Sequence, residues 1–255
     1  SETTDTEMTD TAETMQDETT EAAAEARDVV EIDPANDPRV WLEEVEGDQA
    51  LEWVEGQNDR TFAQLQGDER YQELYDAALE VYQSDDRIPY GSYQNGYIWN
   101  FWRDATNTHG LWRRTSLESY LSDNTEWDVV LDLDAIADEE GVNWVWQGSN
   151  CPGPDYTRCI ITLSDGGQDA SVRREFDLES RSFVDDGFVS PEAKGGMSWV
   201  DQDTVLYGFA TDEENSTTSG YPVAVYRWER GTPIEAATEV LRGDREDVGL
   251  FAFRA

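Results

Sequence analysis

A weak internal repeat over residues 85–255 constrains the fold of this chain more than any other feature of its sequence. Three segments share one pattern, in which a strand that holds arginine is followed by a polar turn and by a strand that ends in acidic residues. Arg113, Arg173 and Arg227 align these segments, at intervals of about 60 and about 54 residues. An apolar strand precedes the second and third segments, and a strand that contains tryptophan precedes that apolar strand.

Antiparallel four-stranded units that recur every roughly 40–50 residues are typical of β-propeller blades. We therefore predict a mainly β fold with N-terminal helices, in which residues 85–255 form an incomplete β-propeller of about three to four blades of antiparallel four-stranded sheets. A short helix at about 133–139 lengthens the first interval. A β-sandwich with a similar number of strands is the structural alternative.

The predicted strands are short and are separated by turn residues. They cover residues 97–102, 111–114, 127–131, 143–146, 159–163, 172–176, 198–200, 204–207 and 223–228. The stretch 248–255 is similar to the opening strand of a further blade. Propellers close with about 4–8 blades, so three blades and part of a fourth would leave open edge strands. We therefore expect the chain to be cut inside the propeller.

Residues 33–84 are predicted to form three helices. The pair Asp37 and Pro38 starts the first helix, because aspartate caps a helix and proline suits its first turn. The second and third helices begin at Asp48 and Asp68, and each carries an apolar stripe at helical spacing. The stripes comprise Leu51, Val54, Phe62 and Leu65 in the second helix and Tyr71, Leu74, Tyr75, Ala78, Leu79 and Tyr82 in the third.

Residues 1–32 are rich in threonine, glutamate, aspartate and alanine, and we predict that they form a disordered acidic tether. The chain starts at Ser1 rather than Met, which indicates that an upstream segment has been removed. Such tethers often follow the processing site of exported proteins, so we expect an exported bacterial protein, periplasmic or tethered as a lipoprotein, with a cytoplasmic location as the alternative. No apolar run approaches the roughly 20 residues that span a bilayer.

The formal net charge is -39, from 57 acidic and 18 basic residues, and Lys194 is the sole lysine. The electrostatic field of so negative a chain repels phosphate groups, so nucleic acids and anionic membrane surfaces are excluded as partners. Binding of cations or basic peptides is one interpretation of this charge. We favour a solvated acidic surface that keeps the protein soluble in high salt, as in marine or halophilic sources, because the acids are spread along the whole chain.

The two cysteines, Cys151 and Cys159, flank a turn rich in proline and glycine. Even with the sole histidine they fall short of the four ligands of a structural zinc site. In an oxidising compartment they could close a disulfide across the turn. Two buried thiols are the equal alternative.

The motifs assign no catalytic, cofactor-binding or metal-binding residue. The sole histidine, His109, lies in a polar hairpin turn, where a surface residue is expected rather than a member of a Ser-His-Asp triad. No G-x-S-x-G nucleophile elbow is present, and the run 195–199 (Gly-Gly-Met-Ser-Trp) has the wrong spacing. Calcium is conceivable at the acidic runs 132–134 and 138–140, but neither has the spacing of a known loop, so a solvated face is expected.

The tryptophans in the predicted strands could stack on sugars or prolyl rings, but a position in a strand favours packing between blades. Trp99 and Trp102 have opposite parity in one strand, so we expect their side chains on opposite faces. The others are Trp112, Trp144, Trp146, Trp199 and Trp228.

The stretch 37–45 (DPRVWLEEV), followed by 50–58 (ALEWVEGQN), is similar to the opening of prolyl oligopeptidases, which reads DPYRWLE and then, after an acidic spacer, a helix with WV-x-x-QN. Later stretches also resemble bacterial members of that family, at residues 97–104, 112–115, 131–134 and 174–178. The resemblance runs from about Asp33 to the end of the chain. The opening motif is fairly specific, and the blade motifs are less so.

The resemblance implies a serine oligopeptidase that cleaves short peptides, typically after proline, with its Ser-His-Asp triad in a C-terminal α/β-hydrolase part. A propeller covers that active site and limits substrate size. On this basis residues 33–84 pack on the missing hydrolase domain, residues 85–255 form the leading blades, and the chain alone is inactive. The alternative is a non-catalytic propeller-like module that binds a peptide or glycan through exposed tryptophans.

Overall fold

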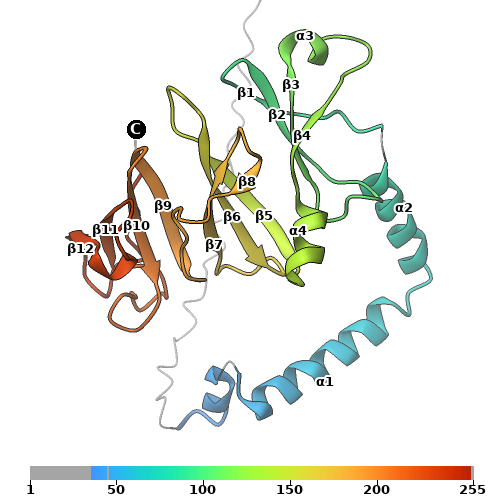
Figure 1. The fold of residues 1–255 in the computed structure, drawn as a ribbon. Coiled ribbons are helices and arrows are strands. Elements are labelled where there is room, and N and C mark those ends of the chain that lie inside the picture. The colour runs from blue at the N-terminus through green and yellow to red at the C-terminus, as the bar shows by residue number, and fades with distance from the viewer. Residues whose placement is uncertain (1–35, 45, 85, 254–255) are drawn as a thin grey trace, which may run out of the picture. The chain divides into compact units, whose positions relative to one another are not determined.

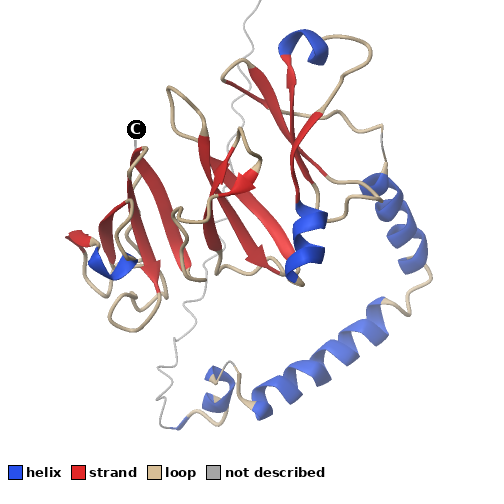
Figure 2. Cartoon of the chain, viewed as in Figure 1, coloured by secondary structure: helices blue, strands red, loops and turns tan. Residues whose placement is uncertain are grey.

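The computed structural model describes residues 36–44, 46–84 and 86–253 (Figures 1 and 2). The acidic tether predicted over residues 1–32 lies outside the described residues. The chain divides into two compact units, residues 1–71 and 72–255. Each unit is described by itself below.

The first unit begins with a single 3₁₀ turn, η2 (Val40–Glu43), where a full helix was predicted. The prediction of a full helix was wrong, since only one turn forms. The Asp37 side chain accepts a hydrogen bond from the backbone N–H of Arg39, as an N-cap residue can, but no α-helix follows. The bonds that follow span three residues, as from Leu42 N–H to the Arg39 carbonyl, which is the 3₁₀ pattern.

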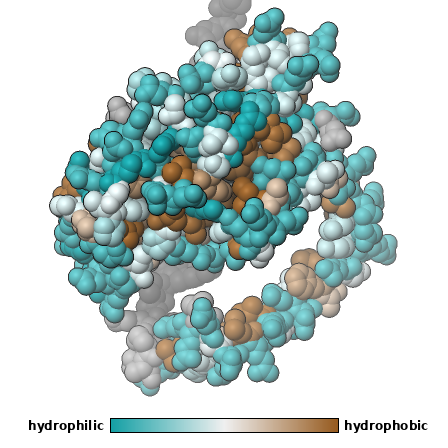
Figure 3. Space-filling model, in the orientation of Figure 1, coloured by the Kyte–Doolittle hydropathy of each residue, from teal (hydrophilic) through white to brown (hydrophobic). Residues whose placement is uncertain are grey.

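The second and third predicted helices are present as α1 (Asp48–Leu65) and α2 (Tyr71–Gln83). Their apolar stripes are largely exposed: Leu51 and Phe62 of α1 keep 47% and 52% of their surface. Hydrophobic residues are visible along α1 in the space-filling view (Figure 3). Within the described part of the chain, Ala50 is the one buried residue of these two helices.

The second unit contains three antiparallel four-stranded sheets in the described residues, each with its strands paired in chain order. The first sheet comprises β1 (Ser92–Gln94), β2 (Tyr97–Trp102), β3 (Leu111–Ser116) and β4 (Asp128–Asp132). The second comprises β5 (Trp144–Asn150), β6 (Arg158–Asp165), β7 (Val172–Asp177) and β8 (Ser182–Phe183). The third comprises β9 (Lys194–Asp201), β10 (Thr204–Ala210), β11 (Ala224–Glu229) and β12 (Thr238–Arg242).

All nine predicted strands are present, and the aligned arginines Arg113, Arg173 and Arg227 all lie on the third strand of their sheets. The repeat in the sequence is therefore a repeat of sheets. The strands that sequence analysis missed are β1, β8 and β12. The first two hold only 3 and 2 residues, and every residue of β12 is exposed, so none has an alternation of buried and exposed positions long enough to detect.

The predicted helix near 133–139 is α4 (Leu133–Glu140), which Asp132 caps by accepting a hydrogen bond from Ala135 N–H at 3.1 Å. Gly141 ends it with a φ of 68°, which glycine adopts without strain. Two further short helices, α3 (Leu117–Tyr120) and the 3₁₀ turn η3 (Ile234–Ala236), were not predicted.

The opening strand of a further blade, predicted over 248–255, is wrong for the described residues 248–253, which form no strand. This segment bonds to the loop before β11 instead of to a neighbouring strand. Leu250 N–H donates to the Pro222 carbonyl at 2.7 Å, and the Phe251 ring lies edge-on to Tyr221 at 6.0 Å.

The second sheet packs on both of its neighbours and lies between them (Figure 1). Strand β6 shows why, because its residues are apolar on both faces: Cys159, Ile161 and Leu163 join a core with the first sheet, and Ile160 joins a core with the third. The first core includes Trp112 and Leu131, and the second includes Val205 and Trp228. Three sheets packed in series are blades of a propeller, which excludes the two-sheet β-sandwich considered as the alternative.

Candidate functional site

His109 lies in the hairpin between β2 and β3. The sequence predicted a surface residue, but the side chain is half-buried. Its ring Nδ1 lies 2.9 Å from the carbonyl oxygen of Trp144, on the first strand of the second sheet. Asp134 accepts hydrogen bonds from the backbone N–H groups of His109 at 3.0 Å and Gly110 at 2.9 Å. Partial burial acts to raise the pKa of Asp134, but these bonds outweigh it and lower the pKa below the ordinary value. His109 therefore connects two sheets, and among the residues that the structure describes no serine hydroxyl is bonded to its ring.

The acidic runs 132–134 and 138–140 have structural partners, so a solvated face describes them incompletely. Glu140 forms an ion pair with Arg174 at 2.7 Å and accepts a hydrogen bond from the Trp144 indole at 2.7 Å. Within the residues that the structure describes, no group of three or more histidine, cysteine, aspartate or glutamate side chains could hold a metal ion.

The strand tryptophans pack in the sheets. Trp112, Trp144, Trp199 and Trp228 are buried, and Trp99, Trp102 and Trp146 are partly buried. The expected opposite faces of Trp99 and Trp102 are confirmed. Trp99 stacks on Trp112 in the core, whereas Trp102 lies between the guanidinium groups of Arg87 and Arg113, at 4.7 Å and 4.5 Å from its ring centre. These tryptophans thus offer no open stacking platform.

The run 195–199 lies on β9, where Ser198 is buried, so it does not form a nucleophile elbow. Gly195 is required there for close packing. A Cβ atom at this position would lie 2.0 Å from the carbonyl oxygen of Gly208 on the neighbouring strand, and its φ of 144° disfavours other residues.

Cys151 and Cys159 form a disulfide with an S–S distance of 2.00 Å, which decides between the two alternatives that the sequence left open. The bond closes the loop between β5 and β6. Both neighbouring sheets hold this end of the hairpin: the Gln94 side chain donates to the Cys151 carbonyl at 3.3 Å, and the Trp199 indole donates to the Asn150 carbonyl at 3.0 Å.

A buried carboxylate connects the second and third sheets. The side chain of Glu175 has no exposed surface, and it accepts hydrogen bonds from Arg158 at 2.8 Å, Arg230 at 2.9 Å and the backbone N–H of Phe188 at 2.9 Å. Burial acts to raise the pKa of Glu175, but the bonds from Arg230, Phe188 and Arg158 outweigh it and lower the pKa. Sequence analysis missed this cluster, because no spacing links residues that lie on separate strands.

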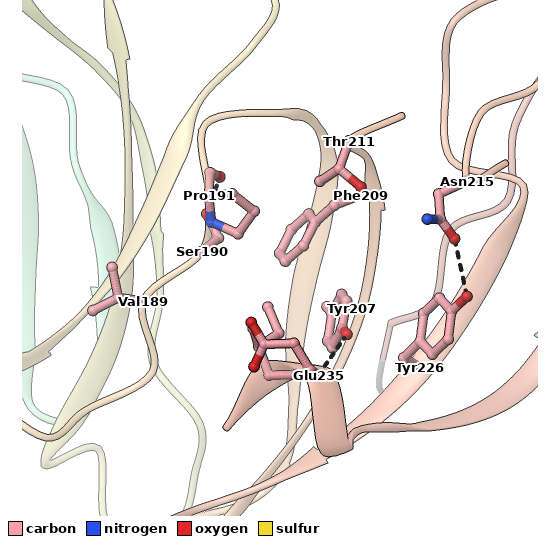
Figure 4. A pocket seen from close by; sticks show the side chains of 10 residues that line it. Val189, Ser190, Pro191, Tyr207, Phe209, Thr211, Asn215, Tyr226 and Glu235 are labelled. Carbon is pink, nitrogen blue, oxygen red and sulfur yellow. Dashed lines mark hydrogen bonds between the residues drawn. The ribbon is translucent and has the colours of Figure 1, made fainter. Parts of the chain in front are cut away.

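The candidate binding site is a cavity of about 470 Å³ between the third sheet and the β8–β9 connection (Figure 4). One wall is a row of three aromatic rings, in which Tyr207 stacks on Phe209 at 4.7 Å and on its cross-strand partner Tyr226 at 5.4 Å. The connection, residues 189–191, faces this wall, and η3 contributes Glu235.

The surroundings of Tyr207 make this site apolar with a negative edge. Burial, with smaller contributions from Tyr226 and Glu235, raises the pKa of Tyr207 to about 12. The volume and the mainly apolar lining are those of small-ligand pockets. Sequence analysis located both strands of the wall but not the pocket, because residues 189–191 and Glu235 meet them only in the fold.

Comparison with known proteins adds the family. The family model described as prolyl oligopeptidase, N-terminal β-propeller domain, matches residues 16–254, so the match begins inside the acidic N-terminal stretch. An uncharacterized peptidase from Sinorhizobium fredii is 44% identical over 215 residues, which cover 84% of this chain and 30% of that protein. An uncharacterized peptidase from Rickettsia prowazekii is 32% identical over 221 residues, which cover 83% of this chain and 30% of that protein.

Among solved structures, a post-proline cleaving enzyme from Rickettsia typhi has a TM-score of 0.78 and 31% identity, over 87% of this chain and 33% of that one. The chain thus spans about a third of the length of the relatives it matches. The three four-stranded sheets and the family match over most of the sequence agree. The chain belongs to the family of prolyl oligopeptidase N-terminal β-propeller domains.

Proposed function

We propose that these 255 residues act within a longer serine peptidase of the prolyl-oligopeptidase type, as the leading part of a propeller that admits short peptides to a catalytic domain. The observation that carries this proposal is the family match over residues 16–254 together with three face-packed, four-stranded sheets. The relatives are named as peptidases, and the Rickettsia typhi protein as a post-proline cleaving enzyme.

Chemistry within the 255 residues is consistent with a part that shields rather than cleaves. The sequence has no G-x-S-x-G motif, and its one histidine is bonded to a backbone carbonyl. We therefore assign peptide cleavage to residues beyond this span.

The exposed stripe of α1 supports a second part of the proposal, in which residues 33–84 pack on the catalytic domain. Leu51, Val54, Phe62 and Leu65 recur at helical spacing and each keeps more than a third of its surface. A helix with this pattern is stable when its apolar face is covered, so a neighbouring domain would bury it.

Hydrolysis of a prolyl amide tests the proposal. The chain of 255 residues should show no turnover above buffer, and the product of the whole gene should cleave the amide and be inactivated by a serine-directed phosphonate. The whole-gene product should also cleave a short proline peptide far faster than the same sequence embedded in a folded protein. Turnover by the 255 residues alone, or a whole-gene product without peptidase activity, would refute the proposal.

We further propose that the protein is exported and works in an oxidising compartment, periplasmic or tethered as a lipoprotein. The disulfide supports this, because such bonds persist mainly outside the reducing cytosol. In the described residues no helix is long and apolar enough to cross a membrane. Cell fractionation with alkylation of free thiols tests the location. Recovery in the cytosolic fraction with both cysteines alkylated would contradict it.

The non-catalytic alternative, in which exposed tryptophans bind a peptide or glycan, has less support. The strand tryptophans are buried or partly buried, and six of them lie in or pack against the two cores between the sheets.

A further inference from the structure

The pocket beside Tyr207 contains side-chain donors whose hydrogens are already used inside the protein. The Tyr207 hydroxyl donates to the Ile234 carbonyl at 3.4 Å, and the Tyr226 hydroxyl donates to the side-chain oxygen of Asn215 at 3.0 Å (Figure 4). A tyrosine hydroxyl carries one hydrogen, so what remains on both is the capacity to accept.

The other hydroxyl groups of the lining also donate their hydrogens to acceptors inside the protein. Ser190 donates to the Pro191 carbonyl at 2.8 Å, and Thr211 donates to Asp212 at 3.1 Å. The amide of Asn215 donates to both carboxylate oxygens of Asp212, at 2.9 Å each. These two oxygens belong to one carboxylate, so they share one hydrogen of the Asn215 amide, and the second hydrogen has no partner among the described residues. The hydroxyl groups of this pocket can therefore only accept a hydrogen bond from a ligand.

Glu235, an exposed residue, adds a carboxylate to the lining of this pocket. Figure 4 shows its carboxylate pointing toward the gap between Val189 of the connection and Tyr207 of the wall. No described residue forms an ion pair or a side-chain hydrogen bond with this carboxylate, and no lysine or arginine is among the lining residues. The guanidinium of Arg173 lies 5.3 Å from the Phe209 ring centre and donates to the carbonyls of Ser171 and Ala193. Arg242, which donates to the Tyr226 hydroxyl at 2.9 Å, is itself paired with Glu239 at 2.7 Å.

We infer that this pocket binds the side chain of a lysine or arginine in a peptide. Both side chains carry donors and no acceptor, which complements a lining whose hydroxyl groups can only accept and which includes a carboxylate. In both side chains the cationic group ends an aliphatic stem. The stem would lie against Val189, Pro191 and the aromatic wall while the cationic group reaches Glu235. The net charge of -39 attracts basic peptides from a distance.

This inference goes beyond the proposed function, because it places a peptide-binding site on the propeller itself and requires no catalysis. The two proposals fail separately. Loss of peptide binding at the pocket would leave prolyl-amide hydrolysis by the whole-gene product unaffected, and an inactive whole-gene product would leave the pocket and its ligand unchanged.

Calorimetric titration of the 255-residue chain with two matched peptides tests the inference. The peptide acetyl-Gly-Lys-Gly-amide carries the cation, and acetyl-Gly-norleucine-Gly-amide has a similar stem without it. Glu235→Gln should weaken binding of the lysine peptide about tenfold, because a charge-assisted hydrogen bond is lost. Glu246→Gln is the matched control, since it removes the same charge from an exposed residue outside the lining and should change affinity less than about twofold.

Each result decides the matter. Binding of the lysine peptide but not of the norleucine peptide, weakened by Glu235→Gln alone, supports the site, and near-ultraviolet circular dichroism checks that each variant keeps its packed tryptophans. Equal binding of the two peptides would mean an apolar slot without charge recognition and overturns the inference. Equal losses in the two variants would mean attraction by the overall field, and no binding at all would mean a pocket that holds water only; both overturn it.

Discussion

Glu175 lies on β7 with its side chain wholly buried, and two arginines from different sheets bind it. A buried charge is costly unless it is paired and hydrogen-bonded. Arg158 binds Glu175 from the neighbouring strand of the same sheet, whereas Arg230 binds it from the third sheet. One residue therefore reports on the contact between two blades.

Replacing Glu175 by Gln should destabilise the chain by about 3 kcal/mol, because Arg158 and Arg230 then lose their shared negative charge and one of its two acceptor oxygens. Urea unfolding at constant salt measures this change. Asp203→Asn is the control, since Asp203 also pairs with Arg230 but its side chain is 78% exposed, and it should cost less than about 1 kcal/mol. Equal effects of the two variants would contradict the assigned role.

The same carboxylate predicts a pH dependence. The pKa of Glu175 is lower in the folded than in the unfolded chain, where glutamate has a pKa of about 4.3. Its stabilising contribution is therefore complete well above that pH and is lost as the pH falls through the lower, folded value. The difference in unfolding free energy between wild type and Glu175→Gln should shrink below about pH 4.3. A difference that stays constant between pH 7 and pH 3 would refute this.

At the scale of elements, the hairpin of β5 and β6 contributes to the contact with both neighbouring sheets. Its strands supply apolar residues to two cores, and its loop is closed by the Cys151–Cys159 disulfide. Gln94 and Trp199 hold this end from the first and third sheets. An ordered loop between β5 and β6 should therefore stabilise the packing of the three sheets against one another.

Reduction of this disulfide should lower the free energy of unfolding by about 2 kcal/mol, as expected for opening a short loop. Urea unfolding with and without a phosphine reductant measures the effect, and hydrogen exchange should increase in residues 151–159. The double variant Cys151→Ser with Cys159→Ser is the control, because it should match the reduced protein and not respond to the reductant. Unchanged stability on reduction would show that packing alone orders the loop.

At the scale of the whole molecule, acidic residues outnumber basic ones by 57 to 18. Even if every arginine and lysine were paired, most carboxylates would remain without a cation, so repulsion acts over the whole surface. The structure adds that several ion pairs, such as Glu175 with Arg230 and Glu140 with Arg174, join different elements. Several of the few cations thus lie at contacts between elements.

Added salt should stabilise the protein, because the screening length falls from about 10 Å at 0.1 M to about 3 Å at 1 M. We expect the melting temperature to rise by about 5 °C or more between 0.1 M and 2 M KCl, measured by circular dichroism. Sucrose at matched osmolarity is the control, because it is excluded from the protein surface but does not screen charges. It should therefore raise the melting temperature less than KCl does. A flat response to KCl would contradict the interpretation of the acidic surface.

The sequence by itself determined most of the strands and the two longer helices, and that the strands recur as blades. These features depend on local spacing: Cys159, Ile160 and Ile161 alternate between two faces, and Arg113, Arg173 and Arg227 mark the same strand in each sheet. Local spacing fails where an element is very short or lacks a buried face, as in β8 and β12.

Only the tertiary structure decided which distant residues meet. Glu175 of the second sheet binds Arg230 of the third, and Glu235 and Tyr207 line a pocket that no sequence motif predicts. It also decided the state of the two cysteines, which the sequence left open. The physical reason is that secondary structure follows from interactions between near neighbours in the chain, whereas buried charges and cavities arise where separate sheets pack, and no spacing in the sequence encodes that distance.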